Sequence, residues 1–395
     1  MKEGEPLMPT VERLTEKDYA EALAVLNTSF SFKETEPDVD LHADFEAILP
    51  IMWTREHDYM SRHLAVRENG KIAAMLGVYP LSTVIAGEKV LLGTIGNVAT
   101  LPSARGKGYM KALVSAALEE AKRIGMVAAR LGGLRSRYNR YDFDHAGVVY
   151  FAELTQRNVR EKANVPVLRF VPIQKEDAQA LDFARKCQES AAMYVERETR
   201  LDFYCALCAW KNRPLLAVNE QGAPVGYLSV SPAGDAIAEW GVTVEWTAVD
   251  LAAAYLAANP DLPGLRFQVA PYDTKNLRAM YLTCESWTAK SCSMFHVFQW
   301  DAFLRPLMKL ALESRGLPEG SLAVEIQGWG TVQLRVKGKE AFVEKTALPA
   351  AISLTPLEAT HWFLGDVPAL QPISAARPEA AWFPLPLSWN GQDRV

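Results

Sequence analysis

The stretch from Thr94 to Gly125 constrains the fold most, because it reads as a buried strand, a tight basic turn and a long helix. The apolar strand ends before Pro102, which cannot donate a backbone hydrogen bond to a neighbouring strand. After Arg105-Gly106-Lys107-Gly108, apolar residues recur every three or four positions as far as Ala121, while charged residues occupy much of the other face. The pattern predicts a helix from Tyr109 to Arg123 that packs one face against a core.

The turn before this helix has the features of an anion-binding site. The first backbone N–H groups of a helix have no partner within it, and they lie at the positive end of its dipole. Gly106 and Gly108 let a ligand approach the backbone closely, and Arg105 and Lys107 add positive charge. The spacing matches neither the dinucleotide fingerprint nor the P-loop. We therefore expect a phosphate or pyrophosphate here; the alternative is an ordinary solvated start of a helix.

The full pattern over residues 98–113, V-A-T-x-P-x-x-R-G-K-G-Y-M-K-A-L, resembles a known loop. It is similar to the acetyl-CoA pyrophosphate loop of the GNAT superfamily of N-acetyltransferases, whose motif is [QR]-x-x-G-x-[GA]. Arg105 takes the first position and Gly108 the glycine, whereas Met110 stands where glycine or alanine is usual. That substitution is typical of the branch similar to the enhanced intracellular survival (Eis) acetyltransferases. The resemblance implies acetyl-CoA as co-substrate, bound by Val98, Ala99, Thr100, Arg105, Gly106, Lys107, Gly108, Tyr109, Met110 and Lys111.

Two further segments carry catalytic residues by the same resemblance. Residues Tyr138 to Phe143 are similar to the family's Y-x-[RK]-[FY]-G-[FY] turn, with Asp142 in place of the usual glycine. By that match Tyr138 is the general acid that protonates the thiolate leaving group; the alternative is that it only packs the turn. The resemblance also implies that the C-terminal carboxylate, here that of Val395, is the general base. The alternative for this end of the chain is a frayed tail.

Hydrophobic patterning around these motifs predicts three units. From His63, alternating segments divide at Asn69-Gly70 and Ala86-Gly87, which indicates an antiparallel meander leading into the opening stretch. A similar order recurs from Phe170 to Ala258 without an equivalent of the R-G-K-G turn, so we expect a duplication whose second copy does not bind the cofactor. The pattern indicates an α/β (α+β) fold class. The resemblance to the Eis-like branch implies tandem GNAT-like mixed-sheet domains followed by a sterol-carrier-like α+β domain. The domains are assigned as residues 1–155 (catalytic), 156–290 (non-catalytic) and 291–395 (sterol-carrier-like).

Composition narrows the classes of partner. The 395 residues include no apolar run long enough to span a membrane, and the start lacks the apolar core of a signal peptide, so we expect a cytoplasmic protein with no membrane partner. A net charge of −5 gives no reason to expect nucleic acid and favours a cationic substrate. The five cysteines are scattered and the six histidines show no ligand spacing, which indicates reduced thiols and no metal site.

The acceptor is the least constrained part of the prediction. The segment from Lys33 to His57 is rich in carboxylates and is either a solvated face or the wall of a groove that attracts an amine. We expect a small-molecule or peptide amine, such as an aminoglycoside, a polyamine or a lysine-like group. The resemblance implies a homo-oligomer, with a hexamer as one form. The alternative is a non-catalytic CoA-sensing or lipid-binding scaffold that retains the fold.

Overall fold

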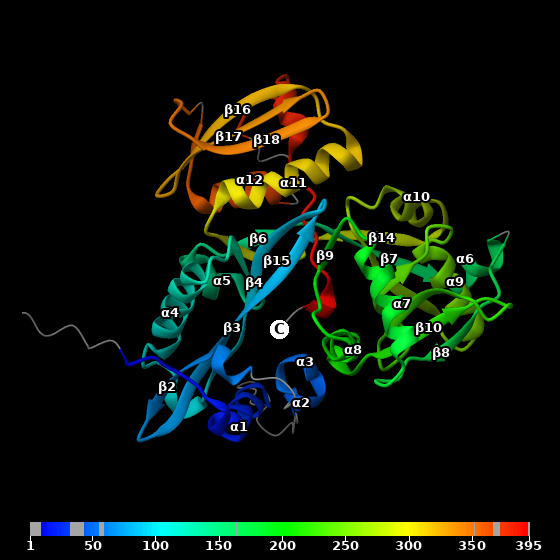
Figure 1. The fold of residues 1–395 in the computed structure, drawn as a ribbon, viewed down its shortest axis with the longest axis horizontal. Helices are drawn as coiled ribbons and strands as arrows, with labels where there is room; N and C mark the ends of the chain where they lie inside the picture. Colours follow the sequence, from blue (N-terminus) through cyan, green and yellow to red (C-terminus); the bar gives the residue numbers. More distant parts are fainter. Residues whose placement is uncertain are drawn as a thin grey trace, which may run out of the picture.

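The computed structural model describes residues 9–31, 43–54, 59–162, 164–350, 352–365 and 372–393. Within these ranges the chain has a mixed α/β architecture, with one eight-stranded sheet, two four-stranded sheets and one three-stranded sheet. Figure 1 shows three groups of elements: β2–β4 with α1–α4, the unit around α7–α10, and β16–β18 with α11 and α12. The predicted mixed α/β class is confirmed, whereas the sterol-carrier-like character of the C-terminal part stays a prediction. No helix in the described ranges is long and apolar enough to cross a membrane.

The first sheet contains the predicted meander. Its strands β2 to β4 are antiparallel and β5 runs parallel to β4. Residues 69–70 and 86–87, at the two hairpin turns, all have positive φ, the backbone that two-residue hairpin loops require. Helix α4 connects β4 to β5 and buries the apolar face that the sequence predicts, with the predicted limits. The bounds are β1 (Glu12–Arg13), β2 (His63–Glu68), β3 (Lys71–Ile85), β4 (Glu88–Thr100), α4 (Tyr109–Arg123) and β5 (Ala128–Leu131).

The N-terminal helices cover one side of this sheet. Thr15 begins η1 (Glu16–Asp18) with a capping box, and α1 (Tyr19–Ser31) follows. Two short helices, α2 (Phe45–Ile48) and α3 (Pro50–Trp53), pack beside α1 in a core that also includes residues of β3. Of the predicted acidic segment, residues 33–42 and 55–57 lie outside the described ranges.

The second unit has the strand and helix order that the sequence predicts for residues 170–258. Its hairpin strands β10 and β11 pair across residues 219–223, and β12 leads to helix α9 and then to β13. Helices α7 and α8 pack on its sheet. The bounds are β8 (Arg169–Pro172), α7 (Ala178–Glu189), α8 (Arg200–Cys208), β10 (Arg213–Val218), β11 (Pro224–Val230), β12 (Ile237–Val242), α9 (Ala248–Ala258), β13 (Gly264–Val269), α10 (Thr274–Thr283) and β14 (Ser286–Lys290).

Strand pairing joins segments that the sequence assigns to different domains. Strand β9 (Met193–Val195) pairs with β3, and β15 (Ser293–Val297) lies between β5 and β6 (Asp144–Ala146) in the first sheet. Strand β7 (Val149–Thr155) is the centre of the sheet that it forms with β13 and β14. Hydrophobic pattern indicates a strand but not its partner, so these pairings could not be read from the sequence.

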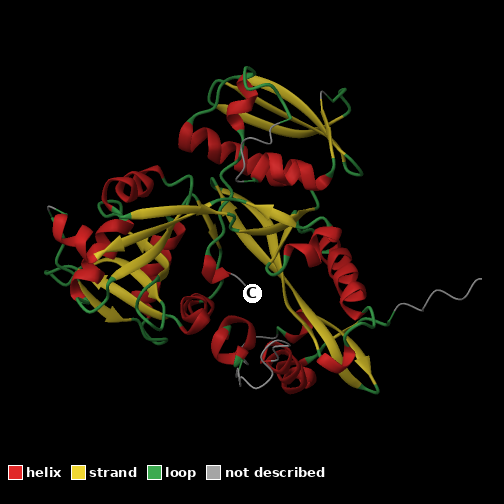
Figure 2. Cartoon of the chain, turned by 180° about the vertical axis from the view of Figure 1, so that it is seen from behind, coloured by secondary structure: helices red, strands yellow, loops and turns green. Residues whose placement is uncertain are grey.

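The third group is a sheet with two helices. Figures 1 and 2 both place α11 between this sheet and the rest of the chain, and one apolar core continues from the sheet across α11 to β4 and β15. The bounds are α11 (Trp300–Arg315), β16 (Gly320–Ile326), β17 (Gly330–Lys337), β18 (Glu340–Thr346), β19 (Ile352–Leu354) and α12 (Pro356–Leu364).

The tail after α12 returns to the middle of the molecule. It contains the short turns η7 (Pro378–Trp382) and η8 (Gly391–Asp393), and the backbone N–H of Val148 donates to the carbonyl of Leu387 at 2.9 Å. Trp389 is buried in the core shared with β15. From residue 372 to Asp393 the tail is therefore packed and not frayed.

Candidate functional site

Strands β4 and β5 part at their carboxyl ends. Residues 92–95 of β4 pair in parallel with residues 128–131 of β5, but β4 continues to Thr100 while β5 ends at Leu131. The edge of β4 from residue 96 onward is therefore without its β5 partner. In α/β sheets such a parting between parallel strands is where ligands bind. Val98, Ala99 and Thr100, which the sequence assigns to the cofactor, lie on this part of β4.

A β-bulge changes the direction of β4 at the same point. Ala99 pairs with Met75 and Gly96 with Gly77, so the register with β3 shifts by one residue between them. Asn97 takes a left-handed backbone, with φ of 53°. Asparagine tolerates this conformation better than most residues do. A bulge re-aims the backbone groups of its strand, and here it does so where β5 leaves β4.

The basic turn follows directly. Gly106 and Gly108 have φ near 80°, and an added Cβ at either position would meet no atom within 4 Å, so glycine serves the backbone conformation and not a tight contact. Gly108 is the N-cap of α4, and no acidic residue lies in the first turn of that helix. The open N–H groups of α4 and the basic side chains are therefore brought together as the sequence predicts.

Glu68, at the end of β2, contacts this turn and was not found from the sequence. Its carboxylate accepts hydrogen bonds from Lys107 Nζ at 2.7 and 2.9 Å and from the Tyr109 hydroxyl. These bonds lower the pKa of Glu68. The contact holds Lys107 beside the start of α4. No sequence signal joins Glu68 to residues about forty positions away.

Tyr138 lies in the segment that follows the end of β5. It belongs to α5 (Arg135–Tyr138), is only 4% exposed, and its ring lies 3.1 Å from where a Cβ at Gly133 would be. Burial raises the pKa of Tyr138, although Arg137 opposes the shift, so the phenol is protonated at neutral pH. Asp142 adopts φ of 58° and ψ of 24°, a left-handed conformation that suits glycine and that aspartate tolerates. The turn therefore closes despite the substitution.

Asp144 holds the turn that contains Tyr138 in place. Its buried carboxylate accepts two hydrogen bonds from Arg135, at 2.6 and 2.7 Å, one from Asn139 at 2.9 Å and one from His361 Nε2 at 2.8 Å. Burial opposes ionisation, but these bonds together with the backbone N–H of His145 outweigh it and lower the pKa of Asp144 to about 2. This contact could not be predicted from local pattern, because His361 comes from α12.

A buried polar chain lies behind the bulge. His63 Nδ1 contacts the carbonyl of Tyr59 at 3.0 Å, and its Nε2 lies 2.7 Å from the Tyr79 hydroxyl, which accepts a 2.6 Å hydrogen bond from Asn97. Burial lowers the pKa of His63 to about 4, so the ring is neutral at pH 7. The chain links Asn97 to β2 and β3 and so supports the bulge. It too was missed, since a lone histidine carries no pattern.

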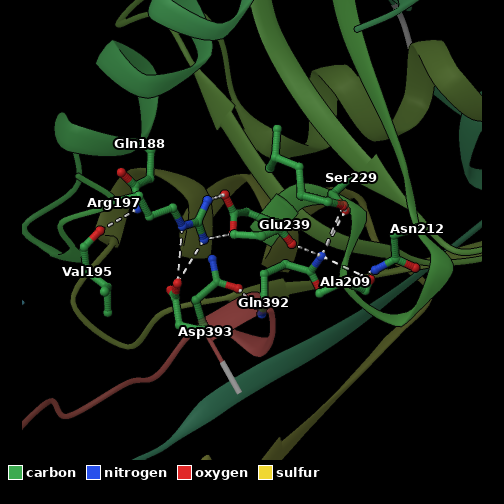
Figure 3. A network of polar contacts seen from close by, with 12 residues as sticks. Gln188, Val195, Arg197, Ala209, Asn212, Ser229, Glu239, Gln392 and Asp393 are labelled. Carbon is green, nitrogen blue, oxygen red and sulfur yellow. Dashed lines mark hydrogen bonds and ion pairs between the residues drawn. The ribbon is translucent and has the colours of Figure 1, made fainter. Parts of the chain in front are cut away.

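The C-terminal tail is anchored in the second unit (Figure 3). Arg197 donates to both carboxylate oxygens of Glu239, at 2.8 and 2.6 Å, and to Oδ1 of Asp393 at 3.1 and 3.2 Å. The Gln392 amide donates to the carbonyls of Ala206 and Leu207 at the end of α8, at 2.9 and 3.2 Å. Val395 lies outside the described residues, so its predicted role stays a prediction, as do those of Tyr138 and the turn.

Comparison with known proteins identifies the first unit. Residues 10–146 match the family described as "Acetyltransferase (GNAT) domain". The comparison with curated proteins gave no match. Three solved structures share the fold along most of the chain. They are a conserved protein from Enterococcus faecalis V583, a "probable N-acyltransferase" (15% identity, 98% of this chain and 97% of that one, TM-score 0.64), a GCN5-related N-acetyltransferase from Anabaena variabilis (16%, 89% and 88%, 0.60) and Eis1 from Mycobacterium abscessus (13%, 89% and 88%, 0.59).

The structural neighbours and the family match support different conclusions. The structural neighbours are too distant in sequence to show more than the fold. The family match shows that residues 10–146 form an acetyltransferase domain of the GNAT type, and acetyl-CoA is the co-substrate of that type. The matched range includes the parted strands, the basic turn and Tyr138.

Proposed function

We propose that the protein transfers an acetyl group from acetyl-CoA to a primary amine at the parted ends of β4 and β5. The observation that carries this proposal is the junction of three features in one short segment. From residue 96 onward, β4 no longer pairs with β5, and the bulge at Asn97 re-aims the backbone of β4. The open N-terminus of α4 follows, with Arg105, Lys107 and Lys111 beside it. An extended cofactor that ends in a pyrophosphate fits that order.

Each part of the segment has a separate task. The pyrophosphate accepts hydrogen bonds from the N–H groups of Gly106 to Lys111, supported by the charge of Arg105. The amide groups of the pantetheine arm pair with the free edge of β4. A backbone N–H at Val98 to Thr100 stabilises the oxyanion that forms on the thioester carbonyl.

The reaction then needs one proton acceptor and one donor. The amine nitrogen attacks the thioester carbonyl carbon and the C–S bond breaks. The departing thiolate takes the phenolic proton of Tyr138, and the amine proton passes to the Val395 carboxylate or to water. The anchoring of Asp393, two residues before the chain ends, supports the role of Val395, because it holds the tail between the first and second units.

The same proposal extends to the branch of the superfamily, the domain assignment and the acceptor. We assign it to the Eis-like branch, with residues 156–290 as a non-catalytic GNAT-like domain and residues 291–395 as a sterol-carrier-like domain. The acceptor class is an aminoglycoside, a polyamine or a lysine-like amine. We also expect a homo-oligomer, with a hexamer as one form; sedimentation of the full chain tests this directly.

Calorimetry with acetyl-CoA tests the central claim. The wild type should bind, and the Arg105→Ala/Gly108→Glu double variant should lose binding, because it removes a cation and places a carboxylate at the start of α4. Lys339→Ala, in the exposed β17–β18 turn, is the control for loss of a surface cation. The proposal is wrong if the wild type does not bind acetyl-CoA at saturating concentration, or if the double variant binds it as tightly as the wild type does.

A further inference from the structure

The second unit repeats the strand–helix–strand order of the candidate site. Strand β12 leads through a turn to α9 and then to β13, and one parallel bridge, between Ala236 and Arg266, joins the two strands. Beyond this bridge β12 and β13 belong to different sheets. A cavity of about 720 Å³ lies at this parting, and the ends of both strands line it together with α7 and the C-terminal tail. That volume is within the range of small-molecule sites.

The edge of β12 that faces the gap carries backbone groups that no described residue binds. Thr243 N donates to the carbonyl of Val225 at 3.0 Å, which continues the antiparallel pairing of Val242 with Gly226 in β11. The backbone groups of successive residues in an antiparallel strand point to opposite sides. The N–H and C=O of Val242 therefore point away from β11 and toward β13. The described residues give neither group a hydrogen bond.

The facing edge of β13 shows the same alternation. Gln156 N donates to the carbonyl of Pro263 at 3.2 Å, next to the regular pairing of β13 with β7. Gln268 is an odd number of positions further along, so its N–H and C=O point into the gap. Its carbonyl accepts a 2.7 Å hydrogen bond from the Trp240 indole, which bridges the two strands. Beyond this bridge the edge at Val242 opens to the cavity.

The charges around the cavity favour neither a cation nor an anion. Arg197 binds both Glu239 and Asp393, and the positive charge of Arg130 also acts on Asp393. Residues of both signs lie in the described lining, namely Lys186, Glu239, Asp273, Lys275 and Asp393. Because these charges oppose one another, an uncharged ligand is the best match.

The turn before α9 has lost the features that suit a phosphate. Thr247 and Asp250 form a capping box, in which Thr247 Oγ1 accepts from Asp250 N at 3.1 Å. Ala248 N donates to Oδ1 of Asn276 at 2.7 Å. N–H groups at the start of α9 are therefore occupied, and the Asp250 carboxylate lies in the first turn. A pyrophosphate is disfavoured here.

Aromatic side chains supply the apolar surface of the cavity. Trp240, Trp246, Phe183 and Tyr272 line it, and all four are half-buried. The hydrogen bond to Gln268 occupies the indole N–H of Trp240, so the ring of Trp240 presents apolar surface. Rings of this kind pack well against another aromatic side chain.

From these observations we propose that the cavity of the second unit is a separate binding site for an uncharged, extended chain with an aromatic residue between two amides, as in a short peptide segment. In an extended chain the N–H and C=O of one residue point the same way, so they match the C=O and N–H of Val242 as an added strand does. The aromatic side chain lies against the tryptophan rings. The proposal does not rest on acetyl transfer at the first site.

N-acetyl-L-tryptophanamide is a suitable probe, because it presents one aromatic residue between two amides and carries no charge. We expect calorimetry with the full chain to give a Kd below about 1 mM. Two analogues should each bind at least about threefold more weakly, since each loses one or more hydrogen bonds to the edge of β12. They are 3-ethylindole, which has the ring but no amide, and the probe methylated on its acetamide nitrogen.

The acetyl-CoA cleft is tested separately. The Arg105→Ala/Gly108→Glu variant should bind the probe like the wild type, because its substitutions lie in the first unit. Acetyl-CoA should not compete with the probe in the wild type. Competition between them would place the probe in the cofactor cleft and overturn the proposal.

Val242→Pro isolates the edge of β12. Proline lacks the N–H that points into the gap, and the β11–β12 ladder loses no bond, because Val242 does not donate to β11. We expect this variant to bind the probe at least about tenfold more weakly, since its ring also obstructs the partner carbonyl. Val242→Ala keeps the N–H and is the matched control; its affinity should stay within about threefold of the wild type. Equal affinity in Val242→Pro and Val242→Ala would overturn the proposal.

A second pair of variants guards against disturbance of β12 by proline. Ala191 lines the cavity and is exposed, so Ala191→Trp fills the space without removing a core contact. It should abolish probe binding, whereas Ala233→Trp, on an exposed loop outside the cavity lining, should not. Absence of probe binding to the wild type, equal binding of 3-ethylindole, or full binding by Ala191→Trp would each contradict the proposal.

Discussion

Asp393 accepts two hydrogen bonds from Arg197 through a single oxygen, at 3.1 and 3.2 Å, although 196 residues separate them. Arg197 follows β9, which pairs with β3, and its other partner Glu239 lies on β12. The ion cluster therefore joins the first sheet, the second unit and the end of the chain. If Val395 is the general base, Arg197 is the residue that positions it.

Loss of Arg197 should separate turnover from cofactor binding. We expect Arg197→Met to lower kcat for amine acetylation by at least about tenfold, since a base displaced from its productive geometry costs that much or more. The Kd for acetyl-CoA should stay within about twofold of the wild type, since the basic turn lies on another element. Arg200→Ala removes an exposed ion pair with Asp182 and is the matched control. Equal kcat in Arg197→Met and the wild type would show that the C-terminal tail takes no part in the mechanism.

The same cluster should give the protein a distinctive pH dependence of stability. Burial raises the pKa of Asp393 to about 6; Arg197 opposes the shift, and the charge of Glu239 adds to it. Among the described residues, Arg130 and the Tyr227 hydroxyl also lie near this cluster. Between about pH 4 and pH 6 the folded chain keeps a proton on Asp393 that the unfolded chain has lost. The contribution of this group to the free energy of unfolding is therefore fully present below about pH 4 and is lost as the pH rises through about 6.

Thermal unfolding across that range measures the effect. As the pH rises from about 4 to about 7, the unfolding midpoint of the wild type should fall relative to that of Asp393→Asn. A difference that is constant with pH would mean that Asp393 keeps an ordinary carboxyl pKa.

The contact between His361 and Asp144 should stabilise the Tyr138 turn. Removing the donor with His361→Ala leaves the buried carboxylate with one partner fewer, which should cost about 1–3 kcal/mol in the free energy of unfolding. His145→Ala is the control, because the His145 side chain is exposed and only its backbone N–H binds Asp144. Denaturant titration compares the two variants, and equal stability would show that the contact contributes nothing.

Local sequence signals predicted the elements well, and long-range contacts hardly at all. The limits of α4 followed from apolar spacing, and the turn at Gly106 and Gly108 from glycine and charge alone. The partner of Asp144 lies 217 residues away, and a single histidine at that distance has no pattern to find. The pairing of β15 with β5 was missed for the same reason, because period-two alternation specifies a face but not a neighbour.

Gly108 should be needed for both conformation and binding. Its φ of 78° makes Gly108→Ala cost about 1 kcal/mol, because the left-handed conformation is strained for any residue with a Cβ. The same change at Gly338, with φ of 59° in the β17–β18 turn, carries a similar strain. Only the variant at Gly108 should also weaken acetyl-CoA binding in calorimetry, by about tenfold or more. Equal affinity in both variants would place the cofactor elsewhere.

Tyr138→Phe tests the acid directly, because it removes one hydroxyl and keeps the ring that fills the space beside Gly133. If the phenol protonates the thiolate, kcat should fall by about 10²- to 10⁴-fold, the usual contribution of a general acid, with the Kd for acetyl-CoA unchanged. Tyr141→Phe, in the same turn but outside the proposed chemistry, should keep most of the activity. Since burial raises the pKa of Tyr138, the phenol stays protonated well above neutral pH, so the wild-type rate should not decline from ionisation of this group below about pH 10. Full activity in Tyr138→Phe would assign the proton donor to water or to another group.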